Sequence, residues 1–386
     1  MRIEEILNGR YTIEPVNCKL EQEIQEAWDG IAKPIGSFGK LERMHCRIGA
    51  IQKEKTPDFN HSRLIVCCGD HGIVEEGVSQ SGQEVTAICA SNIGTGHSTA
   101  GVLMHSAGGE ILAADVGICG ECPVPGTIDR RVADGTRNFL QEPAMTRDEF
   151  LEAVQVGIDL AEESQLAGVT LLAVGEMGIG NTTSAAVLAG KFLGLDAEAV
   201  TGRGAGLDDA GMNRKLEVVR KALLMENALG DEIRTLDDTE RTAWDMGSKT
   251  SDTASNASDD VISTFCQFGG LELAAMAGVI IGGAMYHIPV ILDGVLSMVS
   301  AWVAEKCAHG SKEYILPSHM SREPAAKEFA KALDLEPVID GDLAAGEGVG
   351  AALLIGMLQN VNDVFLRAER FEGYGMEAYE RYEEQE

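Results

Sequence analysis

The sequence predicts an α/β protein with a doubly wound, mostly parallel sheet that is covered by helices on both faces. Short apolar segments alternate along the chain with segments of helical spacing, and each apolar segment runs into a polar turn. Strands that alternate with helices pair in parallel, and such a sheet is buried on both faces. The expected strands are residues 64–68, 110–114, 169–174, 289–292 and 313–316.

Polar residues gather in the turns after these strands. In a parallel sheet the carboxyl ends of the strands form one crevice where ligands bind, so we expect the five turns to line it. Asp70 and His71 follow the first strand and either wall a site or cap backbone donors. Asp293 follows the fourth strand and either binds a ribose or closes its turn. Ser318 and Ser321 follow the fifth and either donate to a phosphate or carboxylate or are simple turn hydroxyls.

The turn after the third strand, residues 175–184, is the most informative segment of the chain. Its glycines let the backbone approach a ligand, and free N–H groups at the start of the next helix favour an anion such as phosphate. Glu176 adds a carboxylate to the same turn. The pattern is neither a P-loop nor a dinucleotide fingerprint, so a tight turn before a capped helix is the alternative. The candidate ligand-binding residues are Gly175, Met177, Gly178, Ile179, Gly180, Asn181 and Thr182.

The remaining segments complete the expected outline. Residues 20–53 have helical spacing that Pro and Gly divide into two helices. Residues 273–285 are apolar, but about 13 residues are too few to span a bilayer, so they predict a buried helix. Residues 231–260 are polar and predict an exposed connection, and residues 372–386 form an acidic tail without a core pattern.

Composition narrows the range of partners. The chain has 386 residues, which suffices for one large domain or two, and a formal net charge of −30. This charge argues against nucleic acid or an anionic membrane surface, and an aromatic content of 5% leaves few residues for stacking on bases. No apolar signal region follows Met1, so we expect a cytoplasmic protein.

The cysteines suggest reduced thiols. Their number, nine, is odd, and Cys119 and Cys122 form a single CxxC pair. A zinc site normally needs a second pair, and the prolines that follow do not suit a redox helix, so metal or redox chemistry is the weaker alternative. We expect no metal ion and no cofactor.

Taken together, these segments resemble the nicotinate-nucleotide–dimethylbenzimidazole phosphoribosyltransferase family of cobamide lower-ligand assembly. The resemblance extends from about Lys33 to about Met357. The blocks that carry it are residues 33–42, 69–72 with 76–79, 83–86, 135–139 with 143–146, 175–184, 202–209, 269–278, 290–294, 318–321 and 346–351. It implies a large α/β domain (60–335) and a small helical domain built from both chain ends (1–59 with 336–386). It also implies a homodimer, with a hetero-oligomer as the alternative.

The implied reaction moves the phosphoribosyl group of nicotinate mononucleotide onto a nitrogen of an aromatic base. The leaving group is already a pyridinium and needs no acid, whereas the attacking base must lose an N–H proton, so one general base is expected. The matching residue is Glu347, between two glycines. Glu176 is the second acid, to stabilise positive charge on the ribosyl carbon or bind a ribose hydroxyl. Lys215 either reaches the phosphate or is a solvated helix lysine.

The acceptor side departs from the family pattern. Ser79 and Gln83 fall in the matching blocks, but residues 80–82 read Gln-Ser-Gly where the family usually has an aromatic residue and a proline. Residues 94–100 also depart, and the polar 231–260 segment is longer than usual. We therefore expect an altered acceptor pocket, with a phenol or a purine as alternative acceptors. A dinucleotide-dependent oxidoreductase and a non-catalytic nucleotide-binding subunit are the alternatives of other classes.

Overall fold

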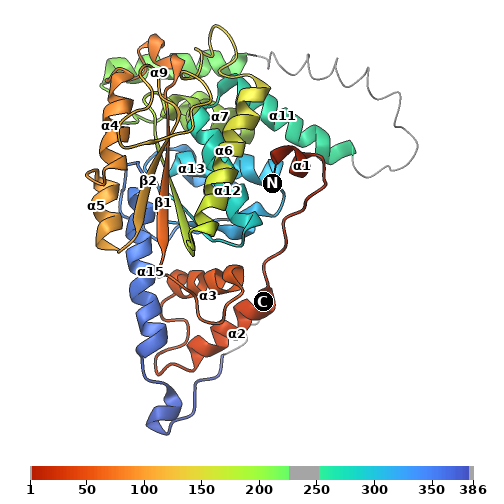
Figure 1. Cartoon of the computed structure of the whole chain (residues 1–386), viewed down its shortest axis with the longest axis vertical. Coiled ribbons are helices and arrows are strands. Elements are labelled where there is room, and N and C mark those ends of the chain that lie inside the picture. The colour runs from red at the N-terminus through yellow and green to blue at the C-terminus, as the bar shows by residue number, and fades with distance from the viewer. Residues whose placement is uncertain (1, 226–251, 382–386) are drawn as a thin grey trace.

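The structure, a computed structural model, describes residues 2–225 and 252–381 (Figure 1). Its centre is a six-stranded, all-parallel sheet in the order β3-β2-β1-β4-β5-β6, which confirms the predicted α/β fold. The short β3 was not predicted, because two residues carry no periodic pattern. The strands are β1 (Ser62–Gly69), β2 (Glu110–Gly117), β3 (Ile128–Asp129), β4 (Leu171–Met177), β5 (Val290–Leu292) and β6 (Ile315–Pro317).

Helices connect and cover the strands. Those before and between the first four strands are α1 (Ile3–Leu7), α2 (Cys18–Asp29), α3 (Lys40–Gln52), η1 (Gly72–Glu76), α4 (Glu84–Gly94), α5 (Thr99–Ser106) and α6 (Arg147–Leu166). Those after β4 are α7 (Asn181–Leu193), α8 (Ala197–Val200), α9 (Asp209–Leu224), α11 (Asp252–Phe268), α12 (Leu271–Met285), α13 (Val295–Cys307), η3 (Ser311–Tyr314), α14 (Ala325–Ala332), α15 (Val349–Arg367) and η4 (Phe371–Tyr374).

The central strand β1 shows how the two faces of the sheet are filled. Its side chains alternate, so Ile65 and Cys67 enter one core while Leu64 and Val66 enter the other. Helices α6, α12 and α13 cover the first face, and α4, α5 and α15 cover the second (Figure 1). Fully buried parallel strands need this two-sided cover, as the sequence predicted.

Two apolar helices belong to the core. Every residue of α12 is buried, as predicted for residues 273–285. Within the described part of the chain, α15 alone is long and apolar enough to cross a membrane, but half of its apolar window is buried inside the protein. It packs against β1, β4 and β5. The length and composition of α15 therefore reflect its place beneath the sheet.

The two chain ends meet around Trp28. This side chain is fully buried between α2, α3 and the end of α15, against Ile24, Cys46 and Phe365. The two helices predicted within residues 20–53 are α2 and α3, which pack on each other. The short α1 instead packs on α6. The division into a large and a small domain stays a prediction.

Two predicted strand boundaries need correction, and most of one predicted connection lies outside the described residues. The strand expected at 313–316 begins only at Ile315, because η3 occupies the residues before it. The strand expected at 110–114 continues to Gly117, because buried Asp115 is paired with Arg131 at 2.8 Å instead of entering a turn. Of the connection expected at 231–260, residues 231–251 lie outside the described residues, and α11 begins at Asp252.

The strand order places the expected crevice. From β1 the chain proceeds to β2 and β3 on one side, and from β4 it proceeds to β5 and β6 on the other. The order therefore reverses between β1 and β4, and ligands in open parallel sheets bind at the carboxyl ends of the strands at such a point.

Candidate active site

A cavity of about 330 Å³ opens at the carboxyl ends of β4, β5 and β6. The turns after these three strands line it, together with one face of α4, residues 204–205 and residues 344–347. The predicted residues that line it are Gly175, Glu176, Met177, Gly178, Ile179, Asn181, Thr182, Asp293, Ser321 and Glu347. Residues 69–72 and 115–117, the predicted turns of the first two strands, do not line the cavity, so three of the five predicted turns form it.

Close backbone contacts explain the glycines in the turn after β4. A Cβ at Gly175 would lie 2.6 Å from the carbonyl oxygen of Glu347, and one at Gly178 would lie 2.3 Å from that of Gly69. Gly180 precedes α7 with φ of +100°, which L side chains rarely adopt. The turn is thereby pressed between β1 and the residues before α15, with the first N–H groups of α7 at the cavity.

Glu176 is a carboxyl group that burial keeps largely protonated. Burial raises its pKa to about 8, and the nearby charge of Glu272 acts in the same direction. The side-chain amide of Asn181 donates a hydrogen bond to Glu176 and opposes this rise. Glu176 therefore carries little negative charge at neutral pH, and a cationic ligand would favour the ionised form.

Lys215 is fully buried beside the start of α7. Its Nζ donates to the Thr182 hydroxyl at 2.9 Å. Burial lowers the pKa of Lys215 to about 8, although the charge of Glu323 acts in the opposite direction. The alternative of a solvated helix lysine is therefore wrong. A buried cation next to a helix N-terminus is suited to bind an anion.

Glu347 stands on a strained turn at the edge of the cavity. Its φ is +58°, between Gly346 at +70° and Gly348 at +89°. Burial raises the pKa of the Glu347 carboxyl, while hydrogen bonds from the Ala100 N–H and the Ser98 hydroxyl lower it. Its Oε2 is buried and has no hydrogen-bond partner among the residues that the structure describes. Glu347 thus combines a held carboxylate with one oxygen that is able to accept a proton.

Asp293 lies between this turn and the turn after β6. Its carboxylate accepts hydrogen bonds from the N–H groups of Gly350 at 2.8 Å and of Gly348 and Ala351 at 3.3 Å. Burial raises the pKa of Asp293 to about 7, against the effect of these bonds. Ser318 donates to the Asp293 carbonyl at 3.0 Å and does not line the cavity.

Asp70 and His71 lie beneath the cavity wall. The Asp70 carboxylate accepts from the Thr86 hydroxyl at 2.6 Å and from the Cys119 N–H at 2.9 Å. The His71 ring bonds to Ser184 at 2.9 Å and to Glu272 at 2.7 Å. Both side chains are buried and meet no part of the cavity surface, which agrees with the alternative in which they satisfy neighbouring groups.

Ser79, Gln83 and Gly180 also stay outside the cavity surface. The Ser79 hydroxyl accepts from the Ser81 N–H at 3.2 Å, and Gln83 donates to the His71 carbonyl at 3.0 Å. This side of the cavity is instead lined by Ser81, which precedes α4, and by Val85 and Cys89 of α4.

Several cavity residues were missed from the sequence. Ser81, Val85 and Cys89 line it at intervals of four residues, the spacing of one helix face, and this periodicity was the available signal. His319 and Glu323 lie in the turn after β6, beside the predicted serines. Ser98 lies far from Glu347 in sequence, and no local pattern marks it.

Within the described part of the chain, no group of three or more His, Cys, Asp or Glu side chains is placed to hold a metal ion. All nine cysteines are free, including Cys119 and Cys122.

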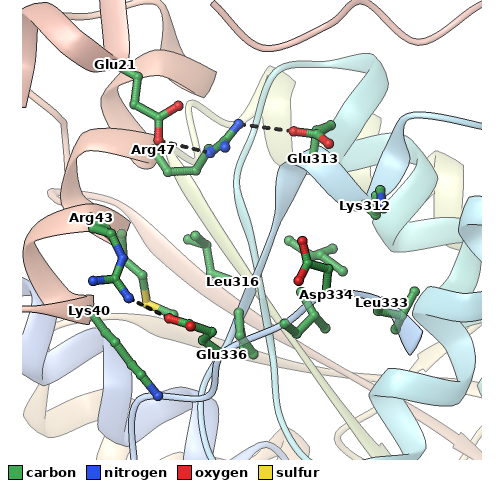
Figure 2. Close-up of a pocket in the computed structure, with 14 residues that line it drawn as sticks. Glu21, Lys40, Arg43, Arg47, Lys312, Glu313, Leu316, Leu333, Asp334 and Glu336 are labelled. Carbon is green, nitrogen blue, oxygen red and sulfur yellow. Dashed lines mark hydrogen bonds and ion pairs between the residues drawn. The ribbon is translucent and has the colours of Figure 1, made fainter. Parts of the chain in front are cut away.

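A second hollow, of about 670 Å³, lies between α3 and the start of β6 (Figure 2). Its rim is charged: Arg47 pairs with Glu21 and Glu313, and Arg43 pairs with Glu336. None of the predicted site residues lies there. These groups tie the N-terminal helices to the sheet edge and neutralise one another.

The fold and the site together define a phosphoribosyltransferase. A sequence model described as "Phosphoribosyltransferase" matches residues 13–240 and 246–375. The chain therefore belongs to the family of the nicotinate-nucleotide–dimethylbenzimidazole phosphoribosyltransferases, as the sequence resemblance indicated.

Relatives and solved structures match nearly the whole chain. The protein of that name from Ruminiclostridium cellulolyticum is 34% identical over 353 residues, covering 92% of each chain. The one from Geotalea uraniireducens is 35% identical over 367 residues, covering 94% of this chain and 96% of the relative. The crystal structure of CobT from Thermus thermophilus superposes with a TM-score of 0.79 at 34% identity and covers 93% of this chain and 99% of that one.

Proposed function

We propose that this protein transfers the 5-phosphoribosyl group of nicotinate mononucleotide to a ring nitrogen of dimethylbenzimidazole or a related base. The products are nicotinate and an α-ribazole phosphate-type nucleotide, made during assembly of the cobamide nucleotide loop. The observation that carries this proposal is the single cavity that Thr182, Glu176 and Glu347 share, with buried Lys215 bonded to Thr182. An anion site, a group that responds to positive charge and a general base are the three functions the reaction needs.

The nucleotide phosphate would lie at the start of α7, where Lys215 and the helix N–H groups neutralise its charge. Residues 175–182 and Ser321 would hold the nucleotide, and Glu176 would face the ribose and its pyridinium. Ionised Glu176 would stabilise positive charge that develops on the ribosyl carbon. Asp70, His71, Ser79, Gln83 and Ser318 would support this surface from behind.

In the transfer, the bond between the pyridinium nitrogen and the ribosyl carbon breaks, and its electron pair stays with nicotinate. The lone pair of the acceptor nitrogen forms the new bond to the same carbon. Glu347 takes the proton from the other ring nitrogen, so that the product base is neutral. Positioning of the two substrates in one cavity supplies much of the remaining rate enhancement.

The cellular location, the cofactor requirement and the oligomeric state are part of the same proposal. We infer that the enzyme acts in the cytoplasm, without a metal ion or cofactor, and as a homodimer. The family resemblance supports the homodimer, and a hetero-oligomer is the alternative.

The decisive experiment incubates the pure chain with nicotinate mononucleotide and a panel of benzimidazoles, purines and phenols, after exhaustive chelation. We expect mass spectrometry to show a ribotide for each acceptor that reacts, with an equal amount of nicotinate. Nucleotide binding without transfer to any acceptor would favour the non-catalytic subunit. Activity that is lost with EDTA and returns with one metal would contradict the metal-free reaction.

A further inference from the structure

The turn that carries Glu347 needs support from outside itself. Three successive residues, Gly346, Glu347 and Gly348, have φ values of +70°, +58° and +89°. Glycine tolerates this region, but a glutamate there is disfavoured and persists only where the surroundings fix it. The source of that support decides how well the Glu347 carboxylate is placed.

The helix that follows has no cap of its own. α15 begins at Val349, and its N-cap residue Gly348 has no side chain to accept the first backbone N–H groups. Asp293, 55 residues earlier in the chain, takes this role from the end of β5. Its Oδ1 accepts from Gly350 and Ala351, and its Oδ2 accepts from Gly348.

Asp293 is itself held firmly. Its side chain is 7% exposed, and the Ser318 hydroxyl donates to its carbonyl at 3.0 Å. The His319 Nδ1 lies 3.7 Å from Asp293 Oδ1. On the opposite side, Gly175 of β4 touches the Glu347 carbonyl. The turn is therefore clamped between the ends of β4 and β5.

We propose that Asp293 is a positioning residue that fixes the Glu347 turn through the start of α15, and that it does not bind the ribose. Both of its carboxylate oxygens are occupied by backbone N–H groups, although the residue borders the cavity. The inference rests on the proposed function, in which Glu347 is the general base. A displacement of about 1 Å at a catalytic group is enough to lower turnover about 10²-fold.

The first test compares Asp293→Asn and Asp293→Ala with the wild-type chain. Asparagine keeps one acceptor oxygen but presents an N–H₂ group to one of the backbone donors, whereas alanine removes every bond. We expect kcat to fall about 10-fold in Asp293→Asn and about 100-fold in Asp293→Ala, with the nucleotide KM changed less than about 3-fold. Asp196→Asn is the matched control, because Asp196 caps α8 by the same kind of bond, at 2.9 Å to the Ala199 N–H.

The second test is a double-mutant cycle with Glu347→Gln. If Asp293 acts only through Glu347, then Asp293→Asn should lower kcat little further once Glu347 no longer accepts the proton. If Asp293 instead binds the ribose, its substitution should raise the nucleotide KM, and the two losses should multiply. That second result would overturn the inference.

Thermal unfolding of each variant separates positioning from misfolding. The Asp293→Asn protein keeps the test decisive if Asp293→Ala does not fold. A folded Asp293→Asn protein with wild-type kcat would also contradict the inference. A wild-type chain that transfers no phosphoribosyl group to any base would overturn the proposed function itself, which the Asp293 variants cannot do.

Discussion

The carbonyl oxygen of Glu347 lies directly against Gly175, where even a methyl group would come within 2.6 Å of it. The last residues of β4 and the turn before α15 are therefore in backbone contact. Because the proposed phosphate site begins in the turn after β4, this contact would fix the distance between that site and Glu347, the proposed general base. The turn after β4 and the turn that carries Glu347 therefore form one continuous side of the cavity.

Replacing Glu347 by glutamine should separate binding from proton transfer. Glutamine keeps the size of the side chain but accepts no proton, so we expect kcat to fall roughly 10²–10⁴-fold. The nucleotide KM should change little, because the phosphate site lies at α7 and Lys215. Steady-state assays at pH 7 measure both constants. Turnover that stays at the wild-type level would make Glu176 the first candidate base.

Ser98 should tune the pH dependence of that base. Its hydroxyl bonds to the Glu347 carboxylate and lowers the pKa of Glu347, and its oxygen also accepts from the Gly101 N–H at 3.1 Å as the cap of α5. Removing the hydroxyl in Ser98→Ala should raise this pKa. A general base works when deprotonated, so the acidic limb of the kcat/KM profile should move to higher pH.

Ser98→Thr is the control for this shift, because threonine restores the hydroxyl and also caps helices. The groups that face Glu347 include Cys89, whose pKa is raised by burial and by the charge of Glu347, and Glu176. An acidic limb that coincides in Ser98→Ala and the wild type would show that Ser98 does not act on Glu347.

Lys215→Met should stabilise the protein while weakening nucleotide binding. Burial lowers the pKa of Lys215 from 10.5 to about 8, so the folded state carries the cost of a buried charge at neutral pH. Methionine removes that charge, and we expect the free energy of unfolding at pH 7 to rise by roughly 2–3 kcal/mol. The nucleotide KM should rise at least about tenfold, because a charge-assisted contact to phosphate is lost.

The pH dependence of the free energy of unfolding tests whether Lys215→Met is stabilising for this reason. Below about pH 8 the lysine is charged in both states and the cost is fully present, whereas above pH 10.5 it is neutral in both. The advantage of Lys215→Met should therefore shrink as pH rises through this window. Denaturant titrations at several pH values measure the difference from the wild type. A variant that is less stable at pH 7 would contradict a charged, buried Lys215.

Nucleotide binding should release a proton from Glu176. Its pKa of about 8 keeps it mostly protonated at pH 7, and the pyridinium of nicotinate mononucleotide should lower that value. Calorimetric titrations at pH 7 in buffers of different ionisation enthalpy should report release of most of one proton. Glu176→Gln should abolish the release. Equal binding enthalpies in all buffers would exclude this role.

The sequence predicts a site residue well when its role depends on its neighbours in the chain, and poorly when the role depends on contacts with distant segments. The turn at residues 175–184 was recognised because glycines, a carboxylate and helix-capping residues stand together. The sequence does not show why each glycine is needed. Gly178 is required because the carbonyl oxygen of Gly69, the last residue of β1, leaves no room for a Cβ atom. A bulky residue at Gly178 would therefore disturb the carboxyl end of β1. Its effect on activity would not test whether phosphate binds in this turn.

Asp70 and His71 illustrate the opposite limit. Their place after the first strand made them candidates, but whether a side chain points into the cavity or beneath it depends on partners such as Ser184 and Glu272, far away in sequence. Burial of Lys215 is equally non-local, because it follows from how α9 packs on α7. Strand and helix patterns therefore predict the fold. Whether a side chain lines the cavity or is buried behind it depends on tertiary contacts.

The acceptor pocket should be less selective than an aromatic-lined one. Of the residues that the structure describes, no Phe, Tyr or Trp lines the cavity, and Ser81, Val85 and Cys89 form its α4 side. An aromatic contact contributes roughly 1 kcal/mol, so its absence weakens binding of dimethylbenzimidazole by a factor of about 5. We expect adenine or phenols to compete measurably when they are mixed with dimethylbenzimidazole.

Ser81→Tyr tests this cause directly, because it places an aromatic ring where the family usually has one. The variant should lower the KM for dimethylbenzimidazole about fivefold and reduce the share of the other acceptors in mixed-substrate assays. Ser91→Tyr is the matched control, since Ser91 lies on α4, the helix that follows Ser81, but away from the cavity. A wild-type chain that strictly prefers dimethylbenzimidazole would show that the aliphatic walls alone select the base. The change at residues 80–82 would then have no bearing on acceptor choice.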